Sequence, residues 1–297
     1  MGEKDITEKV LEDYNDVFAD IVNVLLFHGE RVVKEGSLTN TKDLSQYKIE
    51  NEIHEQERDV SKLWEKQDAG IKNQRGEKVV IAMYGLENQT RIDKEMPFRV
   101  IGYDGAKYRG QVNKKEKSEH FPVVTMVLYF GEKHWDRNRS LYEGMIVPKY
   151  LEPYVNDYKI NVYEIAYLTE EQVNMFTSDF KIVADYFVQM RKNKEYKPSQ
   201  ETIQHVDEVL KLMSVLTKDN RFLKAQQEGN GEVKNMCEVL DRVENRGIAK
   251  GLEQGIRATI LVAKEYGATK ESIVEKIIEM FSLPEDKAKE NVERFYS

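Results

Sequence analysis

The sequence has very little cysteine: Cys237 is the one thiol in 297 residues. A single cysteine excludes an internal disulfide and cannot by itself build a zinc site, which agrees with a reducing compartment. Long hydrophobic runs are also missing, because stretches such as Val79 to Leu86 are far too short to cross a bilayer. The charged start, MGEKDITEKVLEDYND, lacks the apolar segment of a signal peptide. We therefore expect a cytoplasmic chain that has no membrane partner.

Several enzyme signatures are absent as well. The sequence has no G-x-x-x-x-G-K-[ST] phosphate loop and no G-x-S-x-G elbow, which excludes P-loop nucleotide hydrolases and the serine hydrolases built on that elbow. The five histidines are scattered, without an HExxH motif or another close ligand pair that would mark zinc. These classes are therefore set aside.

The chain lacks a net positive charge, since its 53 acidic residues outnumber its 45 lysines and arginines and the formal net charge is −8. A surface that binds DNA all over is disfavoured, because affinity for nucleic acids comes largely from Lys and Arg that neutralise phosphates. Any contact with DNA must be local. The best local candidate is the segment from Arg91 to Lys117, where basic residues outnumber acidic ones, although a solvated helix face often has the same composition.

With 40% hydrophobic and 33% charged residues, the composition is that of a globular protein with one large core or two modest ones. Helical spacing of apolar residues from Tyr14 to Phe27 predicts an amphipathic helix that stops at Gly29. The next thirty or so residues show no sustained period. We expect a short strand around Val32 and a mobile polar stretch there, followed by a strand from Arg58 to Trp64.

Two apolar, β-branched runs predict buried strands, from Lys78 to Gln89 and from Pro122 to Phe130. Between them, Asp93 to Val112 has the pattern of a helix, with Pro97 in the first turn. A strand, a crossover helix and a strand in this order predict a parallel βαβ unit. A further strand is expected from Lys159 to Leu168.

From Thr169 onward the pattern is helical almost without interruption. The short polar segment QEGNG, at 227–231, is the best boundary, so we predict a main domain at 1–226 and a helical C-terminal region at 227–297. The helices that we expect in this half of the chain are 179–192, 199–216, 233–266 and two pieces of the last thirty residues, separated at Leu283-Pro284.

Two carboxylates and an amide can be placed together from the strand pattern. Asp59 begins one strand and Glu87 and Gln89 end the next, so an antiparallel pair would bring all three to one end of the hairpin. Residues 87 and 89 point to the same face because they are two apart on a strand. Two carboxylates and water suit Mg²⁺, Mn²⁺ or Ca²⁺, which can activate a water for attack on a phosphodiester. Solvated strand ends are the alternative.

The sequence around these residues resembles that of a known family. Arg58-Asp59, the segment YGLENQTRIDKEMPFRVIGYDGAKYRGQV at 84–112, YNDVFADIVNVLLFHG near the start and PVVTMVLYFGEKHW at 122–135 are similar to the Rpn family of recombination-promoting nucleases. The resemblance covers roughly the first two thirds of the chain. It implies an α/β fold with a restriction-endonuclease-like αβββαβ core, of the PD-(D/E)XK superfamily, to which a helical C-terminal extension is added.

The resemblance also implies roles for individual residues. Asp59 and Glu87 would be catalytic and hold the metal, and Gln89 stands where the superfamily usually has lysine, a substitution that is typical of this family. The chain would then be a divalent-metal-dependent DNA endonuclease that promotes recombination or transposition-like mobility. Because Gln89 carries no charge, water activation would fall mostly on the metal.

Further residues extend this hypothesis. An acid of the first helix often joins the site in the superfamily, and Asp20 is preferred here over Asp16, although either would also suit a solvent-facing helix position. Arg91, Arg99 and Lys107 are candidates to bind DNA phosphates, and surface ion pairs are an equal alternative for them.

The C-terminal region suggests a second kind of partner. Gly247, Gly251 and Gly255 recur every four residues and would form one stripe of a charged helix, which favours tight helix pairing and a homo-oligomer. An exposed helix weakened by its glycines is the alternative. A rival function therefore stays open: a nuclease fold that has lost catalysis and acts as a DNA-binding or oligomeric interaction module.

Overall fold

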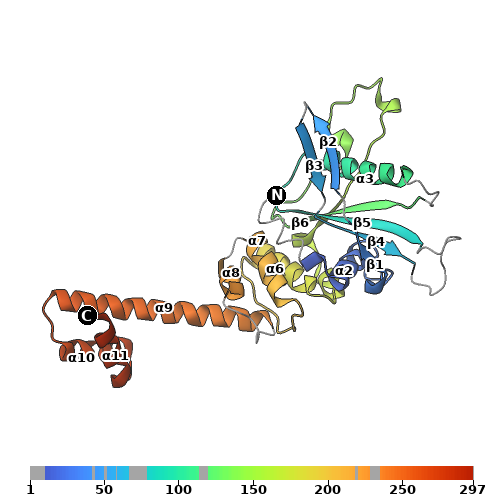
Figure 1. The fold of residues 1–297 in the computed structure, drawn as a ribbon. Coiled ribbons are helices and arrows are strands. Elements are labelled where there is room, and N and C mark those ends of the chain that lie inside the picture. The colour runs from blue at the N-terminus through green and yellow to red at the C-terminus, as the bar shows by residue number, and fades with distance from the viewer. Residues whose placement is uncertain are drawn as a thin grey trace. The chain divides into compact units, whose positions relative to one another are not determined.

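The computed structural model describes residues 11–41, 44–49, 52–57, 59–66, 79–113, 120–217, 220–227 and 235–296. The chain divides into two compact units, Met1–Asn235 and Met236–Ser297. In Figure 1 the colours run from blue to orange through the first unit, and the second unit is orange to red. The first unit contains a mixed sheet and its covering helices, whereas the second is helical.

A five-stranded mixed sheet forms the centre of the first unit, with the strand order β1-β4-β5-β6-β7. β4 pairs antiparallel with both β1 and β5, whereas β6 runs parallel to both β5 and β7. This arrangement confirms the predicted α/β class. The strands of this sheet are β1 (Leu38–Asn40), β4 (Val60–Glu65), β5 (Val80–Gln89), β6 (Val123–Tyr129) and β7 (Asn161–Glu164).

β5 is the central strand of the sheet. Its residues from Ala82 to Asn88 are all buried, as the apolar run predicts for a strand that is covered on both faces. The chain then enters α3 (Met96–Val112) and returns as β6, parallel to β5, so the predicted βαβ unit is confirmed. Pro97 lies in the first turn of α3, where a missing N–H removes no helical hydrogen bond.

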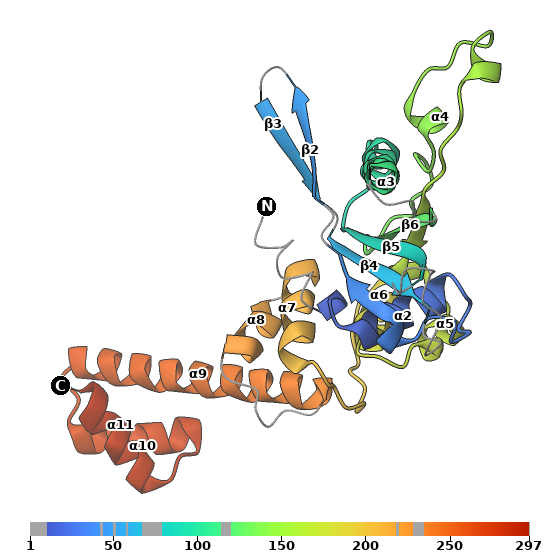
Figure 2. The ribbon, with the colours of Figure 1, turned by 45° about the vertical axis from the view of Figure 1, so that its right-hand side comes forward.

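Helices cover both faces of the sheet (Figure 2): α3 lies on one face, and α2 (Asn15–Leu25) and α6 (Phe180–Asn193) lie on the other. α2 is the predicted first helix, and its apolar side is fully buried against the sheet. The segment after α2 turns away at His28 and Gly29, whose φ angles are 52° and 91°. Glycine adopts such an angle without steric strain, which explains why the helical segment stops there.

The segment between α2 and β4 differs from the prediction. No strand forms at Val32; the side chain of Asn23 instead accepts from the N–H of Val33 and donates to its carbonyl, both at 2.8 Å. These two bonds satisfy the backbone that a strand partner would otherwise satisfy. The strand comes later, as β1, after the 3₁₀ turn η1 (Glu35–Ser37).

The polar stretch that follows β1 contains a hairpin that the sequence did not predict. β2 (Leu44–Ile49) and β3 (Glu52–Glu57) pair antiparallel as a separate two-stranded sheet. Its sequence, LSQYKI and EIHEQE, is mostly polar, and therefore lacks the apolar alternation by which strands are recognised. With the hairpin inserted after β1, the main elements follow one another as α2, β1, β4, β5, α3 and β6.

A long excursion leads from β6 to β7 and contains α4 (Leu141–Gly144) and the 3₁₀ turn η2 (Glu152–Tyr154). Its base is fixed to α3, because the hydroxyl of Tyr158 donates to the carboxylate of Asp104. Gly144 also lies so close to α3 that a Cβ there would be 2.7 Å from the ring of Phe98. The excursion is drawn in green in Figure 2, beside α3.

The first unit ends in helices. The strand predicted from Lys159 to Leu168 is shorter, since β7 passes into the 3₁₀ turn η3 at Ile165–Tyr167. Thr169 begins the first of these helices with a capping box that pairs it with Gln172. The helix predicted from residue 199 begins only at 206, because the carboxylate of Asp179 accepts from the backbone N–H groups of residues 204 and 205. The helices are α5 (Glu170–Met175), α6, α7 (Val206–Thr217) and the unpredicted α8 (Asn220–Gln227).

The second unit consists of α9 (Met236–Glu265), α10 (Lys270–Phe281) and α11 (Glu285–Phe295), with the predicted break before α11. Five apolar side chains of these helices form its core: Ile256, Ile260, Ile273, Ile277 and Val292. Gly255 packs inside the unit, because a Cβ there would be 3.3 Å from the ring of Phe281. Although α9 has 30 residues, no helix in the described part of the chain combines the length and apolar character needed to span a membrane.

Candidate active site

The candidate site lies where β4 begins and β5 ends. Val60 pairs with Leu86 in the antiparallel register, so Asp59, which precedes β4, comes opposite Glu87. A carboxylate oxygen of Asp59 accepts a hydrogen bond of 2.6 Å from the backbone N–H of Asn88. The antiparallel pairing expected from the sequence therefore brings the two acids to one end of the β4–β5 hairpin.

Gln89 shares the face of Glu87, as the two-residue period of a strand predicts. Its side-chain amide donates to Oε1 of Glu87 at 3.3 Å. Glu87 is 2% exposed, so its carboxylate is held away from bulk water. The structure thus brings together Asp59, Glu87 and Gln89, the three residues predicted to be catalytic.

Asn88 points to the opposite face of the sheet and fixes the strand end from behind. Its side-chain amide donates to Oε2 of Glu12 at 2.8 Å, and Glu12 is fully buried. The N–H of Asn88 is held by Asp59 at the same time. The backbone between Glu87 and Gln89 is therefore tethered through two acids on two different segments.

Arg99, from the first turns of α3, reaches the same carboxylate. Its guanidinium forms an ion pair with Oε1 of Glu87 and a second ion pair of 3.0 Å with Asp93. The same guanidinium also donates to the hydroxyl of Tyr103 at 3.1 Å. Burial alone would lower the pKa of Arg99, but the negative charge of Glu87 outweighs it together with the contacts to Tyr103 and Asp93, and the pKa is raised.

Tyr103 lies one helical turn after Arg99, on the side of α3 that faces the site. Burial raises the pKa of its hydroxyl to about 12, with a further contribution from the negative charge of Glu87 and a smaller one from Asp59. The hydroxyl therefore stays protonated at neutral pH. The guanidinium of Arg99 is thus paired with two carboxylates, those of Glu87 and Asp93.

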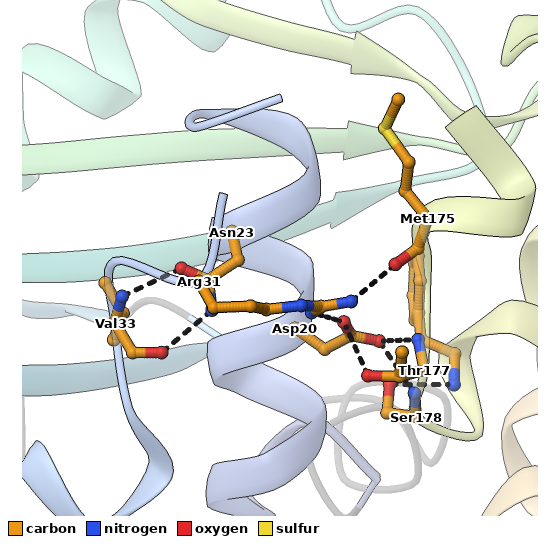
Figure 3. Close-up of polar contacts among 8 residues, drawn as sticks. Asp20, Asn23, Arg31, Val33, Met175, Thr177 and Ser178 are labelled. Atoms are coloured by element: carbon orange, nitrogen blue, oxygen red, sulfur yellow. Dashed lines mark hydrogen bonds and ion pairs between the residues drawn. The ribbon is translucent and has the colours of Figure 1, made fainter. Parts of the chain in front are cut away.

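Asp20 is engaged in another set of contacts (Figure 3). One of its carboxylate oxygens accepts from the backbone N–H groups of Thr177 and Ser178, both at 2.8 Å, and the other forms an ion pair with Arg31. Arg31 also donates to the carbonyl of Met175 at 2.6 Å. Asp20 thus connects α2 to the junction between α5 and α6, and its hydrogen bonds and ion pair involve neither Asp59 nor Glu87.

The other two candidate DNA contacts lie on either side of Arg99. Arg91 is exposed in the bend that follows β5. Lys107 lies on the same side of α3 as Arg99, two turns further on, and donates to the hydroxyl of Thr41 at 3.2 Å. The end of the basic segment, from Lys114 to Lys117, lies outside the described residues.

The oxygen ligands of the site suit a hard cation that takes only a few of its ligands from the protein. Among the residues that the structure describes, no group of three or more His, Cys, Asp and Glu side chains could hold a metal ion. Asp59 and Glu87, with the amide of Gln89, offer oxygen ligands from two neighbouring strand ends. Mg²⁺ is commonly bound through one or two carboxylates, with water and substrate phosphate as its other ligands. The residues therefore fit such an ion, provided that Arg99 leaves Glu87.

Two features of the site could not be assigned from the sequence. Arg99 was a candidate for phosphate binding, but no pattern shows that its partner is Glu87, because this depends on the rotation of α3 over the sheet. The bond between Glu12 and Asn88 joins segments that are far apart in the chain. One hint of this bond was present in the sequence, namely a polar residue, Asn88, at a strand position that faces away from Glu87 and Gln89.

Comparison with protein families gives one match. The model of the family described as "Putative transposase, YhgA-like" matches residues 71–221, which is just over half of the chain. The matched stretch contains Glu87, Gln89 and α3, and it begins after Asp59. Comparison with curated proteins and with solved structures gives no match. The chain therefore belongs to the family described as "Putative transposase, YhgA-like".

Proposed function

We propose that the chain is a divalent-metal-dependent DNA endonuclease whose cleavage promotes recombination or transposition-like mobility. The observation that carries this proposal is the arrangement of Asp59 opposite Glu87, with Gln89 on the same face. Membership of the family described as "Putative transposase, YhgA-like" supports DNA as the substrate. The order α2, β1, β4, β5, α3 and β6 supports a restriction-endonuclease-like core, with the β2–β3 hairpin as an insertion.

Each residue has a proposed task. Asp59 and Glu87 hold a Mg²⁺ or Mn²⁺ ion, with Ca²⁺ as a third candidate. Such an ion supplies a bound water of lowered pKa and offsets charge that develops on the phosphoryl oxygens. Gln89 orients the attacking water through its amide oxygen, while its N–H group contacts Glu87. It cannot take a proton, so turnover is expected to be slow.

DNA is bound by the basic residues beside the acids. The guanidinium of Arg99 suits a phosphate because it donates two parallel hydrogen bonds. Two more basic residues are proposed to bind phosphates next to Arg99: Arg91, which is exposed in the bend after β5, and Lys107, which lies further along α3. In the second unit, the stripe of Gly247 and Gly251 on α9 has open space around it, and we propose it as the contact of a homo-oligomer.

The test is cleavage of supercoiled plasmid with Mg²⁺, Mn²⁺ or Ca²⁺. We expect the wild type to cut in Mg²⁺ or Mn²⁺, and Asp59→Asn and Glu87→Gln to be inactive while remaining folded. Glu95→Gln is the matched control, because Glu95 is an exposed acid at the start of α3. Asp20→Asn should keep activity in the fraction that folds. Equal cleavage by wild type and both site variants would reject the assignment.

A second candidate function is favoured by one observation. The ion pair with Arg99 neutralises Glu87, the acid that a cation needs, and residue 89 is a glutamine instead of the lysine usual in the superfamily. A chain that keeps this pair in the presence of metal would bind DNA, or assemble, without cutting. Retention of a labelled duplex without cleavage in any of the three metals would identify this function.

A further inference from the structure

The ion pair between Glu87 and Arg99 joins a buried group to a partly exposed one. The side chain of Glu87 is 2% exposed and that of Arg99 is 36% exposed. A buried carboxylate is costly unless a positive charge compensates it. In the structure Arg99 of α3 supplies that charge, and its side chain also reaches solvent.

We propose that the guanidinium of Arg99 occupies the position of the divalent cation beside Glu87, and that it leaves Glu87 when it binds a DNA phosphate. Cation binding and DNA binding at this site then favour each other. This inference rests on the proposed function, since it concerns the same site and the same substrate. It adds an order of events: the metal is held weakly until DNA arrives.

The contacts of Arg99 show how it could change partner. Asp93, which is 29% exposed, forms the second ion pair with the guanidinium, and Tyr103 contacts it from the next turn of α3. When the bond to Glu87 breaks, these two residues keep the guanidinium beside the site. A phosphate beside the site would meet a planar group that is suited to bidentate binding.

A cation bound through Oε1 of Glu87 competes with Arg99 in its present position. Oε1 of Glu87 already accepts from Arg99 and Gln89, so a metal ligated by this oxygen must displace at least one of them. Arg99 is the one that a cation repels. A DNA phosphate competes with Glu87 for the same guanidinium, so it weakens the bond that keeps the cation out. Because coupling between two ligands is reciprocal, the cation must strengthen DNA binding to the same extent.

The first experiment measures binding of Mn²⁺ to the full chain without DNA, by electron paramagnetic resonance. We expect Arg99→Gln to bind Mn²⁺ about tenfold more tightly than wild type, which corresponds to about 1.4 kcal/mol. Arg109→Gln, an exposed arginine of the same helix, is the matched control and should bind as wild type does. Arg99→Lys should fall between them. If Arg99→Gln folds only when Mn²⁺ is added, the metal has replaced the missing charge, which also supports the inference.

The second experiment measures binding of a fluorescent DNA duplex by anisotropy, in EDTA and in Ca²⁺. In the wild type Ca²⁺ should tighten duplex binding, and in Arg99→Gln this increase should be lost. Equal Mn²⁺ affinity of wild type, Arg99→Gln and Arg99→Lys, or an equal Ca²⁺ effect on their DNA binding, would overturn the inference. Plasmid cleavage separates the two proposals. If the wild type cuts but the Arg99 substitutions change neither Mn²⁺ affinity nor the Ca²⁺ dependence of DNA binding, only this inference is rejected. If the substitutions change both but no plasmid is cut, only the endonuclease proposal is rejected.

Discussion

Replacing Asp20 tests whether this acid has a structural role. Asp20 is 3% exposed, and its carboxylate connects α2 to Thr177 and Ser178, which are more than 150 positions away in the chain. Asp20→Ala removes the acceptor of two backbone N–H groups. Each buried donor left without an acceptor costs about 1–3 kcal/mol. For the two donors together, we therefore expect the free energy of unfolding to fall by about 2–6 kcal/mol.

Two further variants separate the contributions. Asp20→Asn keeps an oxygen for Thr177 and Ser178 but loses the charge, so it should cost about 1–2 kcal/mol. Arg31→Gln should cost about 1 kcal/mol or less, because the side chain of Arg31 is 44% exposed and its ion pair is screened by solvent. The expected order of destabilisation is therefore Asp20→Ala, then Asp20→Asn, then Arg31→Gln.

The assay is urea unfolding followed by tryptophan fluorescence. Both tryptophans, Trp64 and Trp135, belong to the first unit, and Trp135 is fully buried, so the signal reports the unit that contains Asp20. The slope against urea must stay unchanged for the comparison to hold. A loss below about 1 kcal/mol for Asp20→Ala, or an Arg31→Gln variant as unstable as Asp20→Ala, would refute this reasoning. Lower Mn²⁺ affinity in folded Asp20→Asn would restore its predicted role as a metal ligand.

Three further outcomes are expected. Because the pKa of Tyr103 is raised to about 12, its contribution to stability is complete below pH about 10 and is lost as the pH rises toward 12, so Tyr103→Phe should flatten the fall in unfolding free energy there; an unchanged slope contradicts it. In the monomer, where Gly251 has open space, Gly251→Ala should stabilise α9 by about 0.5–1 kcal/mol in thermal unfolding, whereas at Gly255 the new Cβ would press on the ring of Phe281 and offset this gain. In the proposed homo-oligomer the same Gly251→Ala substitution should weaken association in sedimentation velocity, and unchanged association would refute the contact at Gly251. Thr169→Ala should cost about 1 kcal/mol in urea unfolding through loss of the capping box, and a neutral result would show that the cap is dispensable.

The strand pattern predicted the core of the site because strand geometry leaves little freedom. A period of two places Glu87 and Gln89 on one face, and an antiparallel neighbour that begins at Asp59 can meet them only at the open end of the hairpin. The central position of β5 followed from its apolar run for the same reason. Both inferences need only local pattern and pairing rules.

Helix-borne residues could not be placed in this way. A helical pattern tells which side of α2 is apolar, but the partner of Asp20 is a loop that the chain reaches much later. The rotation of α3 over the sheet decides whether Arg99 faces solvent or Glu87, and no periodicity records it. The β2–β3 hairpin escaped prediction because its strands are mostly polar, so neither alternation nor an apolar face marked it.

The position of Arg99 changes the meaning of the glutamine in the predicted motif. The superfamily that the resemblance implies usually has lysine where Gln89 stands, and the glutamine, which is typical of the family, suggested a site without its own positive charge. The structure places a guanidinium on the same carboxylate oxygen that Gln89 contacts. Positive charge therefore reaches the site from α3 instead of from β5. A charge on a helix-borne side chain with a second partner, Asp93, can leave Glu87 without unfolding the strand, whereas a lysine at residue 89 would remain beside it.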